Sequence, residues 1–432
     1  MKPLFSADSL NPGVRPREVF GWAMYDFANS GYTTVVITAV FAAYFVGGVA
    51  GGASWATLAW TVGLSISYAI VMLTMPGLGA WADRHAAKKW LLMVFTAGCV
   101  LSTAALAWVG PGQVALGLAL LVLSNMFFSY GESLTASFLP ELAKPQAMGR
   151  VSGWGWALGY IGGMLTLGIC LAYVLSAQAR SEPAASFVPV TMLITAGIYG
   201  AAALVTFALM REHAAPRPEA DRPEGVWASV LQMRQTWRAS APYPDFRQLM
   251  ACAVAYQAGV AVAISLAAIY AEQVIGFAPQ ETMVLIFVLN IAAFIGAFVF
   301  GYVQDMLGHK RALALTIAGW ILTCALAAFS TTKGEFWWAA GVAGICMGSS
   351  QSAGRAMAGL LMPAARLGEF FGLWTFAIRL ASIVGPLSYG LITWLTGGNQ
   401  RLAIASTALL FVLGWLLLRP VDMDRGQRAA QA

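Results

Sequence analysis

Apolar residues gather into long continuous windows, separated by glycine, proline and charged residues. Each of twelve windows approaches or exceeds the length of about 20 apolar residues that a helix needs to cross a bilayer. The first six predicted helices cover 19–45, 55–78, 90–109, 114–138, 151–176 and 187–210. The second six cover 248–271, 281–303, 312–330, 336–362, 370–396 and 401–418. Windows this long and continuous do not fit the alternating strands of a membrane β-barrel.

Polar segments divide the predicted helices into two sets of six. The predicted organisation is an N-terminal segment 1–18, a six-helix bundle 19–210, a linker 211–247, a second bundle 248–418 and a tail 419–432. The linker begins as a flexible chain, and 226–239 is expected to form a short helix on the membrane surface. The N-terminal segment lacks the apolar core and cleavage site of a signal peptide.

The composition agrees with a polytopic membrane protein. Hydrophobic residues make up 59% of the chain and charged residues only 10%, against about 25% charged residues in soluble domains. This excludes a secreted enzyme, a nucleic-acid-binding domain and a disordered scaffold. The five cysteines are odd in number, lie in apolar windows and form no CxxC pair, so neither a disulfide framework nor a zinc site is expected.

The placement of positive charge predicts the orientation. Most of the 25 Lys and Arg residues fall on one side of the twelve helices, whereas the opposite side holds only Arg180, Lys333 and Arg401. The positive-inside rule therefore predicts that both termini and the linker are cytoplasmic. The expected location is a bacterial-type inner membrane. Both termini can share a side only if the number of spans is even, which agrees with twelve.

An internal repeat relates the two sets of helices. A Gly-x-x-x-Asp pattern begins at Gly79 and again at Gly301, about 220 residues further on, and lysine or arginine pairs follow both copies. Leu139-Pro140 and Met362-Pro363 recur at nearly the same shift. Because six is even, the repeats are expected to run in the same direction through the membrane, related by an axis along its normal.

The chain resembles the major facilitator superfamily through these two loops. It departs from the superfamily pattern at Ala86 and Ala87, where Gly and Arg are usual, and at Met306, where Arg is usual. Within the superfamily it resembles the vacuole-effluxer-like group, whose fungal members are associated with amino-acid efflux. The segments that carry this resemblance are Gly21-Trp22-Ala23-Met24-Tyr25-Asp26-Phe27-Ala28-Asn29-Ser30, Leu139-Pro140-Glu141 with 149–160, and Glu369-Phe370-Phe371-Gly372.

The resemblance implies an all-α fold of two six-helix bundles and a cytoplasmic latch between them. The gating residues implied are Asp83, Arg84, Lys88, Asp305, Lys310 and Arg311. The two aspartates lie at helix ends, where a carboxylate can accept backbone N–H groups from the start of a neighbouring helix. The alternative is that the lysines and arginines only follow the positive-inside rule.

Four ionisable residues fall within predicted helices: Asp26, Glu132, Arg355 and Arg379. Such a residue costs roughly 2.5–3.5 kcal/mol on insertion scales, so it is a functional candidate by default. Both acids lie in the first half and both arginines in the second. Counted from the cytoplasmic helix ends, all four lie roughly 9–14 Å deep.

Three interpretations of these charges stay open. The pairs could close the cytoplasmic side and break when the bundles move apart, and the shallow depth favours this. They could also divide a zwitterion, with the arginines binding a carboxylate and the acids an ammonium group. The third interpretation is packing alone. If desolvation raises their pKa values, Asp26 and Glu132 are the candidate proton carriers.

Further polar and aromatic residues are candidates for lining a hydrated cavity between the bundles. These candidates are Asn29, Thr33, Tyr256, Gln257, Asn290 and Trp374. The alternative is that such side chains join helices, at about 0.6 kcal/mol for each hydrogen bond.

The sequence predicts a secondary transporter rather than an enzyme. It contains no nucleotide-binding Gly-x-x-x-x-Gly-Lys-[Ser/Thr] pattern, and its three histidines lie far apart in loops, so no cofactor or metal is expected. We expect alternating access for a small solute such as an amino acid, with protons as the candidate coupling ion, in a monomer that binds no nucleic acid. Export of lipophilic cargo and a non-transporting sensor or scaffold are the alternatives.

Overall fold

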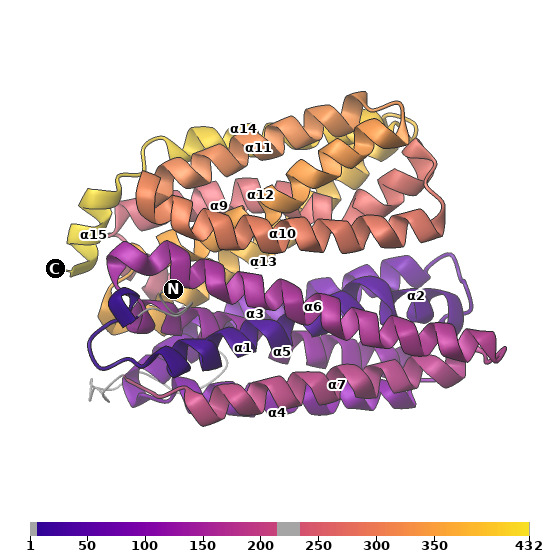
Figure 1. Cartoon of the computed structure of the whole chain (residues 1–432), viewed down its shortest axis with the longest axis horizontal. Coiled ribbons are helices and arrows are strands. Elements are labelled where there is room, and N and C mark those ends of the chain that lie inside the picture. The colour runs from indigo at the N-terminus through magenta and orange to yellow at the C-terminus, as the bar shows by residue number, and fades with distance from the viewer. Residues whose placement is uncertain (1–6, 214–233, 432) are drawn as a thin grey trace.

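The computed structural model describes residues 7–213 and 234–431, except for a few side chains between 266 and 283. Helices are the regular secondary structure of these described residues. Two bundles of long, roughly parallel helices lie against each other, and the first and last described segments, 7–9 and 423–431, lie toward the same end of the molecule (Figure 1). This confirms the predicted fold class of two bundles of membrane-spanning helices.

The N-terminal bundle begins with a long irregular helix. α1 (Pro16–Tyr32) continues through η2 (Thr33–Ala39) and α2 (Phe41–Tyr44) into η3 (Phe45–Val49). The remaining helices are α3 (Ala56–His85), α4 (Lys88–Ala105) with η4 (Leu106–Trp108), α5 (Val114–Leu142), α6 (Met148–Ala179) and α7 (Ala184–Leu209). Short turns η1 (Ala7–Ser9) and η5 (Pro145–Ala147) precede α1 and α6.

The C-terminal bundle repeats this order. Its helices are α9 (Pro244–Tyr270) with η6 (Ala271–Ile275), α10 (Pro279–Leu307), α11 (His309–Phe329), α12 (Lys333–Leu360), α13 (Leu367–Leu395) after η7 (Ala364–Arg366), and α14 (Gln400–Leu418). The tail adds α15 (Met423–Gln431), a helix that the sequence analysis does not predict. Of the surface helix expected over 226–239, residues 234–239 are helical and the rest lies outside the described residues.

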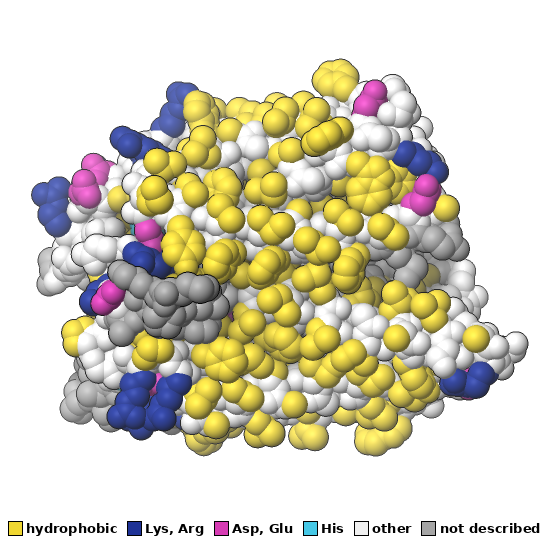
Figure 2. Space-filling model, viewed as in Figure 1, with side chains coloured by type: hydrophobic (Ala, Val, Ile, Leu, Met, Phe, Trp, Pro, Cys, Tyr) yellow, Lys and Arg dark blue, Asp and Glu magenta, His cyan; other side chains and the backbone are white. Residues whose placement is uncertain are grey.

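Eleven helices in the described part of the chain are long and apolar enough to cross a membrane. The tenth predicted span, α12, is 28 residues long but falls outside this set because it combines Lys333 and Glu335 with a polar run around Gln351. Large apolar side chains point outward, as on Trp108 and Phe329, which are 78% and 83% exposed. Figure 2 shows hydrophobic side chains across the middle of the molecule and charges gathered near its two edges.

Two ends of the molecule are distinguished by the loops that meet there. The terminal face carries η5, η7, α15 and the starts of α1 and α9, and Lys144 there donates to the Asp8 carbonyl oxygen at 3.1 Å. The far face carries the opposite helix ends, where Lys333 donates to Glu281 at 2.6 Å. The Lys333 hydrogen bond lowers the pKa of the exposed Glu281 carboxyl.

The loops of the internal repeat turn through a left-handed residue at the same place. Ala86 ends α3 at φ 49° and Gly308 ends α10 at φ 88°. Glycine adopts positive φ without steric cost, whereas an L-residue with a Cβ does not. This explains why glycine is usual at the position of Ala86.

Candidate functional site

Two acid–arginine pairs join the bundles about a third of the way in from the terminal face. Arg355 of α12 donates from Nη1 to Oδ2 of Asp26 in α1 at 2.8 Å. Arg379 of α13 donates from Nη2 to Oε2 of Glu132 in α5. The structure therefore brings together all four intramembrane charges, each acid with an arginine of the other bundle.

The Asp26–Arg355 pair is largely enclosed. Arg355 also donates from Nε to the Ser152 hydroxyl at 3.2 Å and from Nη2 to the Ser152 carbonyl oxygen at 2.9 Å. Its guanidinium carbon lies 4.7 Å from the Trp22 ring centroid and 5.2 Å from that of Trp156. The side chains of Arg355 and Asp26 are only 7% and 12% exposed.

Gly155 lets α6 close over this pair. A Cβ at this position would lie 2.7 Å from Arg355 Nη2 and 2.8 Å from Trp22 Cη2, and it would also overlap the Asp26 carboxylate. These distances leave no room for a further group between α6 and the ion pair.

The Glu132–Arg379 pair is open by comparison. The Glu132 side chain is 39% exposed, although Arg379 is only 9% exposed. The Arg379 guanidinium carbon lies 5.2 Å from the Tyr68 ring centroid and 6.0 Å from that of Phe128. Its Nε is buried and has no hydrogen-bond partner among the described atoms. Arg379 thus keeps an unused donor, and the Glu132 carboxylate stays partly exposed.

On the terminal side of these pairs, Asp83 joins α3 to the start of α13. Its carboxylate accepts the backbone N–H groups of Gly368 and Glu369, both at 3.0 Å. The first N–H groups of a helix have no intrahelical partner, so a carboxylate there is favoured. Lys88 lies 3.4 Å from Asp83 and also pairs with Glu141. This is the contact that the sequence predicts for Asp83, with Glu141 as an additional acid.

The second repeat makes the matching contact between α10 and α6. Asp305 accepts the backbone N–H groups of Gly149 and Arg150 at 3.0 and 3.3 Å. The Arg150 side chain also donates from Nε to Asp305 at 2.8 Å. Gly153 and Gly301 let the two backbones approach closely just beyond this cap. The basic partner of Asp305 therefore comes from the opposite bundle.

The other predicted gating residues lie outside these two contacts. Arg84 donates to the Ala80 carbonyl oxygen of its own helix at 3.4 Å. Lys310 donates to the Arg419 carbonyl oxygen at 2.7 Å, within the C-terminal bundle, and Arg311 is exposed. Their positions fit basic residues at the edge of the membrane.

The remaining cavity candidates of the N-terminal bundle, and Asn290, do not join the ion pairs. Asn29 is buried and accepts a hydrogen bond from Tyr199 of α7 at 2.6 Å, which turns its side-chain oxygen into the bundle. Thr33 donates to the Asn29 carbonyl oxygen at 3.2 Å, and Asn290 donates to Ile286 of its own helix at 2.8 Å.

The candidates of the C-terminal bundle form a second cluster between α9, α12 and α13. Gln257 donates to Gln351 at 2.8 Å and to the Tyr256 hydroxyl at 3.3 Å. Trp374 is buried and lies against Gly354, where an added Cβ would be 3.3 Å from its ring.

Sequence reasoning missed several residues that hold the pairs in place. Ser152 and Trp22 enter the sequence analysis only within the segments that carry the family resemblance, and Tyr68 and Phe128 are not among the candidates. A serine or aromatic residue in an apolar helix carries no signal of its own, because only the partner helix decides what it contacts. Glu141 could have been found as an acid at a helix end beside the basic loop that follows α3.

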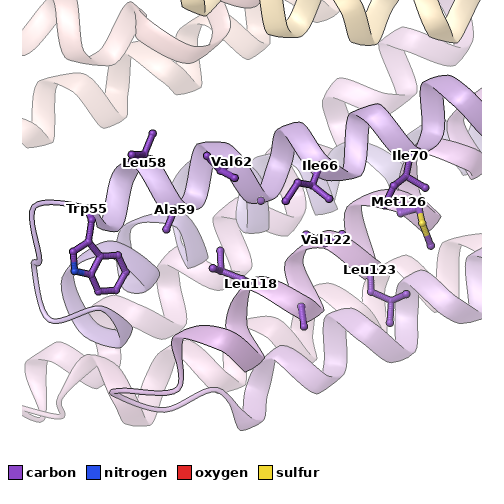
Figure 3. Close-up of a pocket in the computed structure, with 12 residues that line it drawn as sticks. Trp55, Leu58, Ala59, Val62, Ile66, Ile70, Leu118, Val122, Leu123 and Met126 are labelled. Atoms are coloured by element: carbon purple, nitrogen blue, oxygen red, sulfur yellow. The ribbon is translucent and has the colours of Figure 1, made fainter.

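An apolar groove of about 840 Å³ is lined by none of the four ion-pair residues. It runs between the far-face halves of α3 and α5, with Trp55 and Leu58 at one end and Met126 at the other (Figure 3). No charged side chain lines it among the described residues.

A family comparison agrees with the fold and the repeated loops. The model of the family described as vacuole effluxer Atg22 like matches residues 43–431. The chain belongs to this family. It is an integral, multi-pass membrane transporter of the major facilitator superfamily and not an enzyme.

Similar proteins occur in bacteria and fungi. The uncharacterized MFS-type transporter YxiO of Bacillus subtilis (strain 168) is 29% identical over 419 residues, covering 95% of this chain and 96% of that protein. Autophagy-related protein 22-1 of Aspergillus niger is 22% identical over 304 residues, covering 65% of this chain and 48% of the fungal protein. The match thus spans about half the length of the fungal relative.

Solved transporter structures share the fold at low sequence identity. The human organic anion transporter MFSD10 superposes with a TM-score of 0.75 at 15% identity, covering 93% of this chain and 99% of that one. The proton:xylose symporter XylE gives a TM-score of 0.70 at 13% identity, covering 94% and 95%. An outward-facing bacterial homologue of ferroportin gives 0.68 at 12%, covering 94% and 98%.

Proposed function

We propose that the chain moves a small zwitterion, such as an amino acid, across the membrane by alternating access of its two bundles. The observation that carries this proposal is the Glu132–Arg379 pair, a partly exposed carboxylate beside an arginine with an unused donor. Arginine binds carboxylates with directed, charge-assisted hydrogen bonds, and a carboxylate suits an ammonium group. The efflux of amino acids associated with the fungal members of the family points to the same class of cargo.

In this proposal the two ion pairs have different tasks. When the substrate binds, the Glu132–Arg379 ion pair breaks. Glu132 then binds the ammonium group of the substrate, and Arg379 binds its carboxylate. Asp26 and Arg355 close the terminal side, because α6 packs over them at Gly155 and excludes a ligand. The gating interpretation of the sequence thus applies to Asp26 and Arg355, and the substrate interpretation applies to Glu132 and Arg379.

The terminal face is the cytoplasmic face in this proposal, as the distribution of Lys and Arg predicts. All the hydrogen bonds and ion pairs between the bundles that involve described residues lie in the terminal-face half. Glu132 would then be reached from the far, external side. With no nucleotide-binding sequence pattern, transport runs down a gradient or is coupled to an ion, for which Glu132 and Asp26 are the candidate proton carriers.

The test is counterflow into proteoliposomes that contain the purified protein, with each of the twenty proteinogenic amino acids in turn. At least one amino acid is expected to exchange, and the Arg379→Gln variant is expected to lose that exchange while it still elutes as a folded monodisperse protein. The absence of exchange for all twenty would contradict the zwitterion assignment.

A second candidate function is export of lipophilic cargo, which the apolar groove between α3 and α5 favours. Val62, a groove residue that is 47% exposed, can be replaced by tryptophan to fill it. If the groove binds cargo, Val62→Trp should abolish transport of tetraphenylphosphonium and leave amino-acid exchange intact. If the variant transports tetraphenylphosphonium like the parent protein, or if neither protein transports it, the groove has no such role.

A further inference from the structure

The first turn of α6 is held from two directions by the C-terminal bundle. At its start, the Asp305 carboxylate of α10 caps the N–H groups of Gly149 and Arg150. Within the same turn, Ser152 meets Arg355 of α12. The α6–α10 contact on the terminal face and the central ion pair therefore act on one short, rigid piece of helix.

Ser152 uses both of its oxygens at this point. Its hydroxyl accepts from Arg355 Nε at 3.2 Å and donates to the Ser352 carbonyl oxygen at 2.9 Å, and its carbonyl oxygen accepts from Arg355 Nη2 at 2.9 Å. The side chain is completely buried. Because the third donor, Arg355 Nη1, binds Asp26, one guanidinium ties α1 and α6 of the N-terminal bundle to α12.

The network continues to the residue beside the α6 cap. Gln304, which directly precedes Asp305, is completely buried and donates from Nε2 to the Ser352 hydroxyl at 3.2 Å. Ser352 belongs to α12, three residues before Arg355, and its carbonyl oxygen accepts a hydrogen bond from the Ser152 hydroxyl. α10 therefore contacts both helices that hold the ion pair, α6 through the Asp305 cap and α12 through Ser352.

The contact between α3 and α13 has no such intermediary. There the arginine of the ion pair, Arg379, belongs to the capped helix α13 itself. Ser133 donates to the Phe371 carbonyl oxygen at 3.3 Å and accepts from Thr375 at 2.7 Å. These two hydroxyls join α5 to α13 without a hydrogen bond to the side chain of Glu132 or Arg379 among the described residues, so they provide a matched control for Ser152.

We propose that Ser152 is a positioning residue that couples the Asp26–Arg355 ion pair to the α6–α10 contact. While Asp26 is charged, it draws Arg355 into the place where Ser152 accepts hydrogen bonds from Nε and Nη2 of the guanidinium, and α6 is held against α10. When Asp26 loses its charge, Arg355 is no longer fixed between α1 and α6, and the hold on α6 weakens. The inference rests on the proposed function only in that the bundles must move apart at the terminal face.

The test is a double-mutant cycle of Asp26→Asn and Ser152→Ala, read as the distance between α6 and α10 on the terminal face. Spin labels on cysteines introduced at Gln146 and Met306, both exposed, report this distance in the full-length protein. The five native cysteines are buried, which restricts labelling to the introduced sites. The readout needs no substrate, so it is independent of whether the protein transports amino acids.

Asp26→Asn is expected to raise the ratio of open to closed molecules about five-fold or more, at the lower end of typical coupling between sites. In the Ser152→Ala background it should have almost no further effect, and Ser152→Thr, which keeps the hydroxyl, should restore the response. Ser133→Ala is expected to leave the response to Asp26→Asn intact. Additive effects of Asp26→Asn and Ser152→Ala, or an equal loss of response in Ser133→Ala, would overturn the proposal.

Discussion

The two ion pairs lie at similar depth but in opposite surroundings. Glu132 and Arg355 are separated along the chain by the same spacing as Leu139 and Met362 of the internal repeat, yet the Glu132 side chain is 39% exposed and the Arg355 side chain 7%. Around Arg355, two tryptophan rings, Ser152 and the backbone of α6 leave little solvent. Around Arg379, the rings of Tyr68 and Phe128 contact the guanidinium, and Nε has no hydrogen-bond partner among the described atoms.

This difference determines what each pair can do. Removing one member of an enclosed pair leaves an uncompensated charge in a medium of low dielectric constant, so the Asp26–Arg355 pair favours a single closed arrangement. In a partly hydrated pair, water can replace a lost partner, and so can a ligand. Under the proposed function, the enclosed pair is therefore suited to closure and the partly exposed pair to exchange.

The largest difference is expected when each arginine loses its charge. Arg355→Gln leaves Asp26 buried without its cation, and breaking a buried pair costs about 3–5 kcal/mol. Arg379→Gln leaves a carboxylate that water reaches, with a cost of about 1 kcal/mol or less. Thermal unfolding in detergent should show a much larger decrease in Tm for Arg355→Gln. Equal decreases would mean that the two pairs do not differ in enclosure.

A smaller but more specific effect is expected at the glycine over the enclosed pair. Gly155→Ala places a methyl group against Asp26, Arg355 and Trp22, and such overpacking typically costs about 1–3 kcal/mol. The variant should lose closure on the terminal face, measured by the same spin-label distance, and lose exchange in proteoliposomes. Gly168→Ala is the control, since no atom lies within 4 Å of a Cβ there, and it should behave like the parent protein.

The sequence predicted the fold and the members of the two pairs, because charge in an apolar helix is rare and costly enough to carry a signal. It could not predict which pair is enclosed. That depends on how closely α6 approaches the pair at Gly155. α6 contains several glycines, and the sequence alone does not show which of them packs against which neighbouring helix.

Polar spacing along one helix predicted the cavity lining less well. Asn29 follows Asp26 by three positions, which places both on one face of a helix, but Tyr199 of α7 donates a hydrogen bond to the Asn29 side-chain oxygen. A helical face has neighbours on both flanks, so two polar residues three positions apart can serve different contacts. Arg84 and Lys310 are a similar case. Their loop motif predicts the fold, but it does not predict which group each side chain contacts.

The smallest effects are expected from the aromatic rings beside the arginines. Phe128→Leu removes a ring face from Arg379, and Trp156→Phe weakens one beside Arg355 without losing a hydrogen bond, because the Trp156 Nε1 has no partner among the described atoms. Each cation–π contact is worth roughly 0.5–1 kcal/mol. Kinetic assays should show a KM change of a few-fold for Phe128→Leu and an unchanged KM for Trp156→Phe. A reversed pattern would assign substrate contact to the enclosed pair.

The division of tasks between the two pairs is tested most directly by equilibrium binding to two variants of nearly identical shape. Glu132→Gln and Asp26→Asn each remove one negative charge, and Kd can be measured by isothermal titration with the amino acid that exchanges best in counterflow. The account predicts that Glu132→Gln weakens binding about ten-fold or more, equal to about 1.4 kcal/mol, while Asp26→Asn changes Kd by less than about two-fold. Weakened binding in Asp26→Asn with unchanged binding in Glu132→Gln would contradict it.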